Sequence, residues 1–120
     1  MARESFHQAL EGLKKDVLAM GELVDQAIDA AIQALKKRDI AWAQKIVEED
    51  IVINRMRFGI EEKCLSLLAT QQPMARDLRT IAAVLSIITD LERMADHAEG
   101  IARINIMMGD EPLLKPLIDI

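Results

Sequence analysis

The sequence predicts an all-α fold, an elongated up-down-up antiparallel bundle of three helices. Apolar residues make up 51% of the 120 residues and aromatic residues only 2%, so the core must consist of aliphatic side chains. Apolar positions recur at alternating steps of three and four along most of the chain, which is the period of packed helices. Two breaks in this period, near residues 38 and 73, divide the chain into three helices, each roughly 50 Å long at 1.5 Å per residue.

The first helix is expected over about residues 4–37, and cations at its carbonyl end suit the helix dipole. These cations, Lys36, Lys37 and Arg38, fit a solvated helix end better than a phosphate site. The apolar seam of this helix comprises Phe6, Leu10, Leu13, Val17, Met20, Val24, Ala27, Ala31 and Leu35.

Asp39 is the expected N-cap of a second helix that continues to about Thr70. No Gly or Pro separates it from the first helix, so the two should be antiparallel neighbours. Two charged residues fall on its seam, and a charge there must pair, reach the edge or bind something. Cys64 sits among leucines and is expected to be a buried thiol. The predicted seam is Ala43, Ile46, Asp50, Ile53, Arg57, Ile60, Cys64 and Leu67.

Gln71, Gln72 and Pro73 form the predicted second turn, with Pro73 at the first position of the third helix. This helix should run to about Met108 and end at Gly109. Its predicted seam is Val84, Ile87, Leu91, Met94, Ala98 and Ile101. A second line, apolar in the first half of the helix and partly acidic in the second, flanks that seam at Met74, Leu78, Ile81, Leu85, Ile88, Glu92, Ala95, Glu99 and Ala102.

Composition excludes several classes of function. A net charge of −5 argues against a nucleic-acid surface, and a single cysteine excludes an internal disulfide and a cysteine-rich zinc site. The longest apolar run, residues 81–88, is too short to span a membrane, and the N-terminus is polar, so a cytoplasmic protein is expected. Without a phosphate-binding loop or a nucleophile elbow, no enzyme class is indicated.

Four side chains are the candidate metal ligands. Antiparallel pairing about Gln72 and Pro73 brings the i,i+4 pair Asp50 and Asn54 to the level of the i,i+4 pair Glu92 and Asp96. Oxygen ligands of this kind suit iron, manganese or magnesium. The alternative is a solvated edge whose carboxylates pair with arginines, namely Arg55, Arg57, Arg93 and Arg103.

The two histidines add little to this site. His97, beside Asp96, is either an outer ligand or a surface residue. Glu4 and His7 form one Glu-x-x-His pair, whereas a di-iron bundle of the ferritin type needs two such pairs and further glutamates. A metal-carrying helical bundle of ferritin or hemerythrin type is the alternative function, and the absence of a second Glu-x-x-His pair weighs against it.

The segment LATQQPMARDLRTIAAVLSIITDLERMADHAEGIARI resembles the PhoU family of phosphate-uptake regulators. The Gln-Gln-Pro turn, the block 75–79 and the block 89–98 stand in the order and spacing of that family, and residues 20–35 are similar to its first helix. The resemblance implies that residues 1–109 form one three-helix repeat and that residues 110–120 are a linker or the start of a second repeat. Glu92-x-x-x-Asp96 matches the family's cation-binding motif, while Asp50-x-x-x-Asn54 departs from it at its last position.

The resemblance also implies a function. It indicates a non-enzymatic cytoplasmic regulator that links the ATPase subunit of a phosphate ABC transporter to a sensor histidine kinase. An isolated repeat should leave exposed the apolar surface that normally meets its sister repeat, so a homo-oligomer is expected.

Overall fold

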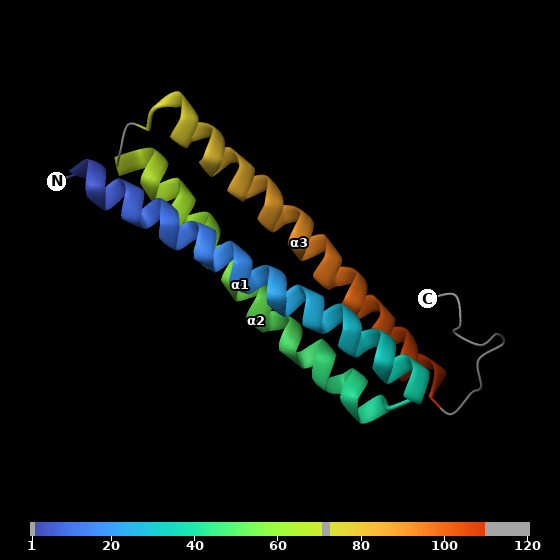
Figure 1. The fold of residues 1–120 in the computed structure, drawn as a ribbon. Coiled ribbons are helices and arrows are strands. Elements are labelled where there is room, and N and C mark those ends of the chain that lie inside the picture. The colour runs from blue at the N-terminus through green and yellow to red at the C-terminus, as the bar shows by residue number, and fades with distance from the viewer. Residues whose placement is uncertain (1, 71–72, 110–120) are drawn as a thin grey trace.

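The computed structural model describes residues 2–70 and 73–109, and it confirms the predicted three-helix bundle. Helix α1 spans Ala2–Lys37, α2 spans Ile40–Thr70 and α3 spans Ala75–Met108. They run up, down and up, so the end of α3 lies beside the α1–α2 connection (Figure 1). The molecule is elongated, with extents of 61 × 25 × 16 Å. The tail, residues 110–120, and Gln71 and Gln72 of the predicted turn lie outside the described residues.

The connection between α1 and α2 is closed by backbone geometry and one side chain. Arg38 has a φ of 55°, in the left-handed region that residues other than glycine rarely adopt. This turn lets the amide of Arg38 donate to the carbonyl of Leu35 (3.1 Å) and the amide of Asp39 donate to the carbonyl of Ala34 (2.9 Å). These two hydrogen bonds define a Schellman cap. The Asp39 carboxylate accepts the amide of Trp42 at 3.0 Å, which confirms the predicted N-cap.

The seam of α2 is almost as predicted. All its apolar members are buried, Asp50 is only 9% exposed, and Arg57 is partly buried. Cys64 is fully buried as a free thiol, and burial, with the nearby charge of Glu61, raises its pKa. A buried, protonated thiol is a packing residue rather than a nucleophile.

Of the six residues of the predicted α3 seam, only Val84 and Ala98 are buried. Ile87 and Met94 are each 44% exposed, and Leu91 and Ile101 are only partly buried. The helix instead turns what was predicted to be the flanking line inward, and its buried residues are Ile81, Val84, Ile88, Ala95, Ala98, Ala102 and Asn105. Both lines are apolar in the first half of α3, so the period alone does not choose between them.

The start of α3 also differs from the prediction. Met74 is the N-cap, without a side-chain hydrogen bond, so Pro73 precedes the helix by two residues rather than occupying its first position. The predicted end is confirmed, because Gly109 has a φ of 55° and its amide donates to the carbonyls of Asn105 and Ile106.

The core consists of two clusters that differ in side-chain size. The larger one combines aliphatic residues with Phe6 and extends to Ala95. The smaller one lies toward the α1–α2 connection and is built mainly from alanines, namely Ala31, Ala34, Ala43, Ala98 and Ala102, together with Ile46. In this half Asn105, fully buried, donates from Nδ2 to the carbonyl of Ala34 at 3.0 Å. Arg38 donates to the carbonyl of Gly109 at 2.5 Å, so polar contacts tie the ends of α1 and α3 together.

Candidate functional site

Two of the four predicted metal ligands are in direct contact. Asp50 and Asn54 lie one turn apart on α2, and Nδ2 of Asn54 donates to Oδ2 of Asp50 at 3.2 Å. Asp96 on α3 is exposed, and its charge acts on Asp50 across the two helices. These three side chains therefore lie on the α2–α3 side of the bundle.

The fourth predicted ligand, Glu92, is engaged elsewhere. Its Oε2 accepts a hydrogen bond from Nε of Arg57, whose Nη1 lies 2.5 Å from Oε2 of Glu61. Arg57 also stacks over the ring of Phe58, with 4.7 Å between the guanidinium carbon and the ring centroid. The two carboxylates raise the pKa of Arg57 further, so it stays charged. The seam charge of α2 is thus satisfied by pairing, which is the alternative that the sequence left open for these carboxylates.

The register of α2 against α3 differs from the prediction by one helical turn. The turn-based register placed Asp50 opposite Ala95, but Asp50 forms a side-chain hydrogen bond with Glu99. The predicted register places Ile88 opposite Arg57. Arg57 instead donates a hydrogen bond to Glu92, which lies four residues farther along α3. A shift of one whole turn keeps the same faces in contact, so the apolar period cannot detect it.

Glu99 is the site residue that the metal prediction missed. Desolvation by burial is the largest of the effects that together raise the pKa of Asp50 to about 6, and the hydrogen bond and charge of Glu99 are the next largest. Burial opposes ionisation of Glu99 too, but hydrogen bonds from Asp50 and Arg103 hold its pKa below the usual value. Below about pH 6 the proton therefore resides on Asp50, which donates to the ionised Glu99. The sequence signals were the place of Glu99 on the flanking line of α3 and its position three residues after Asp96 in an acidic stretch.

Within residues 2–70 and 73–109, no three carboxylate, histidine or cysteine side chains are grouped closely enough to hold a metal ion. Glu92, one of the four predicted ligands, is paired with Arg57. A cation at the four predicted residues would require Glu92 to leave Arg57. His97 is exposed. His7, the histidine of the one Glu-x-x-His pair, has its Nε2 atom 3.8 Å from Oδ2 of Asp77.

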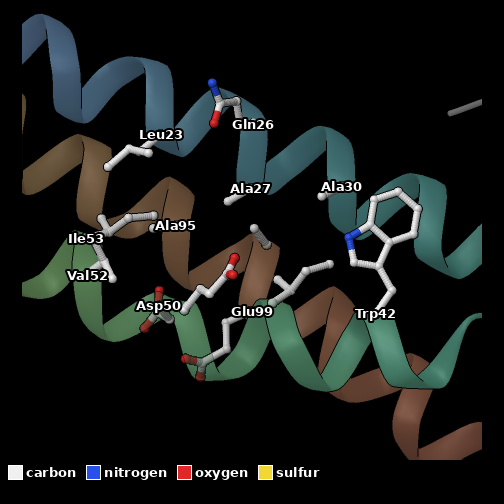
Figure 2. Close-up of a pocket in the computed structure, with 13 residues that line it drawn as sticks. Leu23, Gln26, Ala27, Ala30, Trp42, Asp50, Val52, Ile53, Ala95 and Glu99 are labelled. Carbon is white, nitrogen blue, oxygen red and sulfur yellow. The ribbon is translucent and has the colours of Figure 1, made fainter.

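A pocket of about 380 Å³ adjoins the carboxyl pair. It opens between α1 and α2, with α3 as its floor, and Trp42 stands at one end (Figure 2). Glu99 lines it from α3. The remaining lining residues are Leu23, Gln26, Ala27 and Ala30 of α1, Ile46, Glu49, Asp50, Val52 and Ile53 of α2, and Ala95 and Ala98 of α3.

Comparison with known proteins gives a consistent result. The PhoU domain family matches residues 17–104. The chain is 41% identical over 111 residues to the "Phosphate-specific transport system accessory protein PhoU homolog" of Aquifex aeolicus, covering 92% of the chain and 50% of that protein. It is 40% identical over 108 residues to the homologue of the same name from Pseudomonas putida, covering 90% of the chain and 42% of that protein.

A solved structure shows the same arrangement of helices. The crystal structure of PhoU from Pseudomonas aeruginosa superimposes with a TM-score of 0.84 at 40% identity, over 88% of this chain and 51% of that one. The chain thus spans about half the length of the curated relatives it matches. In the described part of the chain, no helix has the length and apolar character needed to cross a membrane.

Proposed function

Because this chain belongs to the PhoU family, we propose that it is a non-enzymatic regulator of phosphate uptake and phosphate-starvation signalling. The observation that carries the proposal is similarity to phosphate-transport accessory proteins along nearly the whole chain, at 41% identity. In this role the chain acts in the cytoplasm as an adaptor between the ATPase subunit of a phosphate ABC transporter and a sensor histidine kinase. The elongated three-helix bundle suits such a role, since its length leaves long outer faces for two partners.

Loss of the repeat is expected to abolish repression. A strain whose encoded protein lacks residues 17–104 should express a phosphate-starvation reporter in phosphate-rich medium, because the adaptor can no longer hold the kinase inactive. The measurement is reporter activity at high and low phosphate, with the complete gene supplied from a plasmid as the control. Normal repression in the deleted strain, at matched protein abundance, would contradict the adaptor role.

We also propose that a cation binds at Asp50, Asn54, Glu92 and Asp96. Support comes from the proximity of Asp50, Asn54 and Asp96 and from the pKa of Asp50, which burial raises first and the charges of Glu99 and Asp96 raise in addition. Iron, manganese or magnesium would relieve this repulsion, provided that the ion draws Glu92 away from Arg57.

Added Mn²⁺, Mg²⁺ or Fe³⁺ is therefore expected to raise the melting temperature. An ion that binds only the folded state at a hundred times its Kd adds about 2.7 kcal/mol to the free energy of unfolding. Replacing Glu92 and Asp96 together by alanine should abolish the shift, and Asn54→Asp should enlarge it. The double variant Asp25→Ala, Asp29→Ala removes an exposed i,i+4 acidic pair from α1 and should leave the shift unchanged. Equal melting with and without ions would reject the site.

Self-association is the third part of the proposal. Ile51, Phe58 and Leu65 recur at every seventh position on the outside of α2 and are 50%, 56% and 53% exposed. Such an apolar stripe on a helix surface is typical of a contact face. Sedimentation at high protein concentration should show a dimer or larger species, which Leu65→Asp weakens and Ser66→Asp, on the neighbouring exposed position, does not. A monomer at every concentration would refute this part.

A further inference from the structure

The pocket between α1 and α2 has two chemically distinct parts. Its wall is aliphatic over most of its length, with Ala27 and Ala30 on one side and Ile46 and Ile53 on the other. Trp42 stands at one end with its ring turned toward α1, and Asp50 and Glu99 lie away from it on the wall formed by α2 and α3, with Leu23, Val52 and Ile53 beyond them (Figure 2). A volume of about 380 Å³ falls at the small end of the range of pockets that hold organic ligands.

The charge of the lining selects the ligand. All ionisable side chains that line the pocket are carboxylates, namely Glu49, Asp50 and Glu99. Phosphate, nucleotides and fatty acids would therefore meet repulsion, whatever the role of the family in phosphate transport. Glu49 is 62% exposed at the rim, with Lys45 at 3.9 Å, whereas Asp50 is 91% buried and lines the pocket. The deep anionic part is thus formed by Asp50 and Glu99.

The tryptophan end has the opposite preference. Nζ of Lys37 lies 5.8 Å from the ring centroid of Trp42, so a second cation is disfavoured at this end. The indole and the alanine wall favour an apolar group there instead. A ligand with one cationic and one apolar end has a single favourable orientation in this pocket.

We propose that this pocket binds a small organic ammonium compound, with its ammonium group at Asp50 and Glu99 and its apolar part along the alanine wall toward Trp42. Asn54 and Arg103 each donate to one carboxylate oxygen of Asp50 or Glu99, and the ammonium donates to the remaining oxygens in place of the proton that joins the two carboxyl groups. A bare metal ion would use the carboxylates but gain nothing from the apolar wall. This site goes beyond the proposed function, because it assigns a small-molecule ligand to the repeat.

Trp42 makes the proposal directly measurable. It is the single tryptophan of a chain without tyrosine, so its fluorescence reports on the pocket. The probe is n-hexylamine, titrated into the full chain in the presence of EDTA, with hexan-1-ol and hexanoate as matched neutral and anionic probes. Hexylamine should give a saturable change in Trp42 emission, hexanol should bind about tenfold more weakly, and hexanoate should not bind.

Four variants locate the ligand. Asp50→Asn and Glu99→Gln each remove one carboxylate and should weaken hexylamine binding about tenfold. Glu48→Gln makes the same change on an exposed residue outside the pocket and should leave the Kd unchanged. Ala30→Leu fills the wall and should block both hexylamine and hexanol. Circular dichroism of each variant verifies that it is folded.

Several results would overturn the proposal. The first is a Trp42 fluorescence change that hexylamine and hexanoate produce equally. The second is the absence of a saturable fluorescence change with hexylamine. The third is that Glu48→Gln weakens hexylamine binding as much as Glu99→Gln does. A signal that appears with Mn²⁺ but not with hexylamine would identify a metal site instead and would equally reject an organic ligand. Failure of any of these tests leaves the adaptor role intact, since that role is read from a reporter strain.

Discussion

Replacing Ile88 with aspartate is expected to unfold the bundle. Ile88 is 1% exposed and belongs to the larger core cluster, so the substitution buries an unpaired carboxylate and removes an aliphatic side chain. The expected loss is about 4 kcal/mol or more of the free energy of unfolding, which is comparable to the whole stability of a small domain. Thermal and urea denaturation followed by circular dichroism measures it.

Ile87→Asp is the matched control for this variant. The residue, the substitution and the helix are the same, but Ile87 is 44% exposed, so its carboxylate stays in water. The expected loss is about 1 kcal/mol or less. If Ile87→Asp is the more damaging of the two, α3 presents to the core the face that the apolar pattern first indicated, and the orientation described above is incorrect.

Asp50→Asn is expected to stabilise the protein at neutral pH. Asp50 has a pKa of about 6 when folded, above the ordinary value of 3.8, so the native state binds the proton more tightly than the unfolded state does. The stability that this proton contributes is complete below pH 4 and is lost as the pH rises toward 6. Above pH 6 the ionised carboxylate costs about 2–3 kcal/mol. The asparagine is neutral at every pH and can donate to Glu99 as the protonated acid does.

The test compares free energies of unfolding at pH 4.5 and pH 7.5. Asp50→Asn should exceed the parent by about 2 kcal/mol at pH 7.5 and by much less at pH 4.5. Asp90→Asn changes an exposed position of α3, so its free energy of unfolding should equal that of the parent at both pH 4.5 and pH 7.5. A constant difference between Asp50→Asn and the parent across this range would show that Asp50 is ionised equally in both states.

Local chemistry made much of this fold predictable. The three helices, their ends near Lys37, Thr70 and Met108, and the cap at Asp39 follow from patterns within a few residues of each position. The buried seam of α2 followed as well, because its apolar residues recur at alternating steps of three and four along the helix, and these residues are the buried ones. Cys64 was placed in the core by the same pattern.

The candidate site was predictable only in part. Asp50 and Asn54 share a helix face because they are one turn apart, and the sequence alone establishes that. Their neighbours on α3 depend on the register between two helices. The partner of Asp50 is Glu99, and that of Glu92 is Arg57. The pocket beside them depends on how three helices approach one another, which no single helix encodes.

The sequence by itself determined the number of helices, their lengths and the line of α2 that faces the core, because these depend on residues one or two turns apart. Only the tertiary structure decided which of two neighbouring lines of α3 is buried and which turn of α3 meets Asp50. The physical reason is that α3 is apolar on both lines and that sliding by one turn repeats the same face. The choice falls to packing, where the small side chains of Ala95, Ala98 and Ala102 allow α3 to lie close against its neighbours.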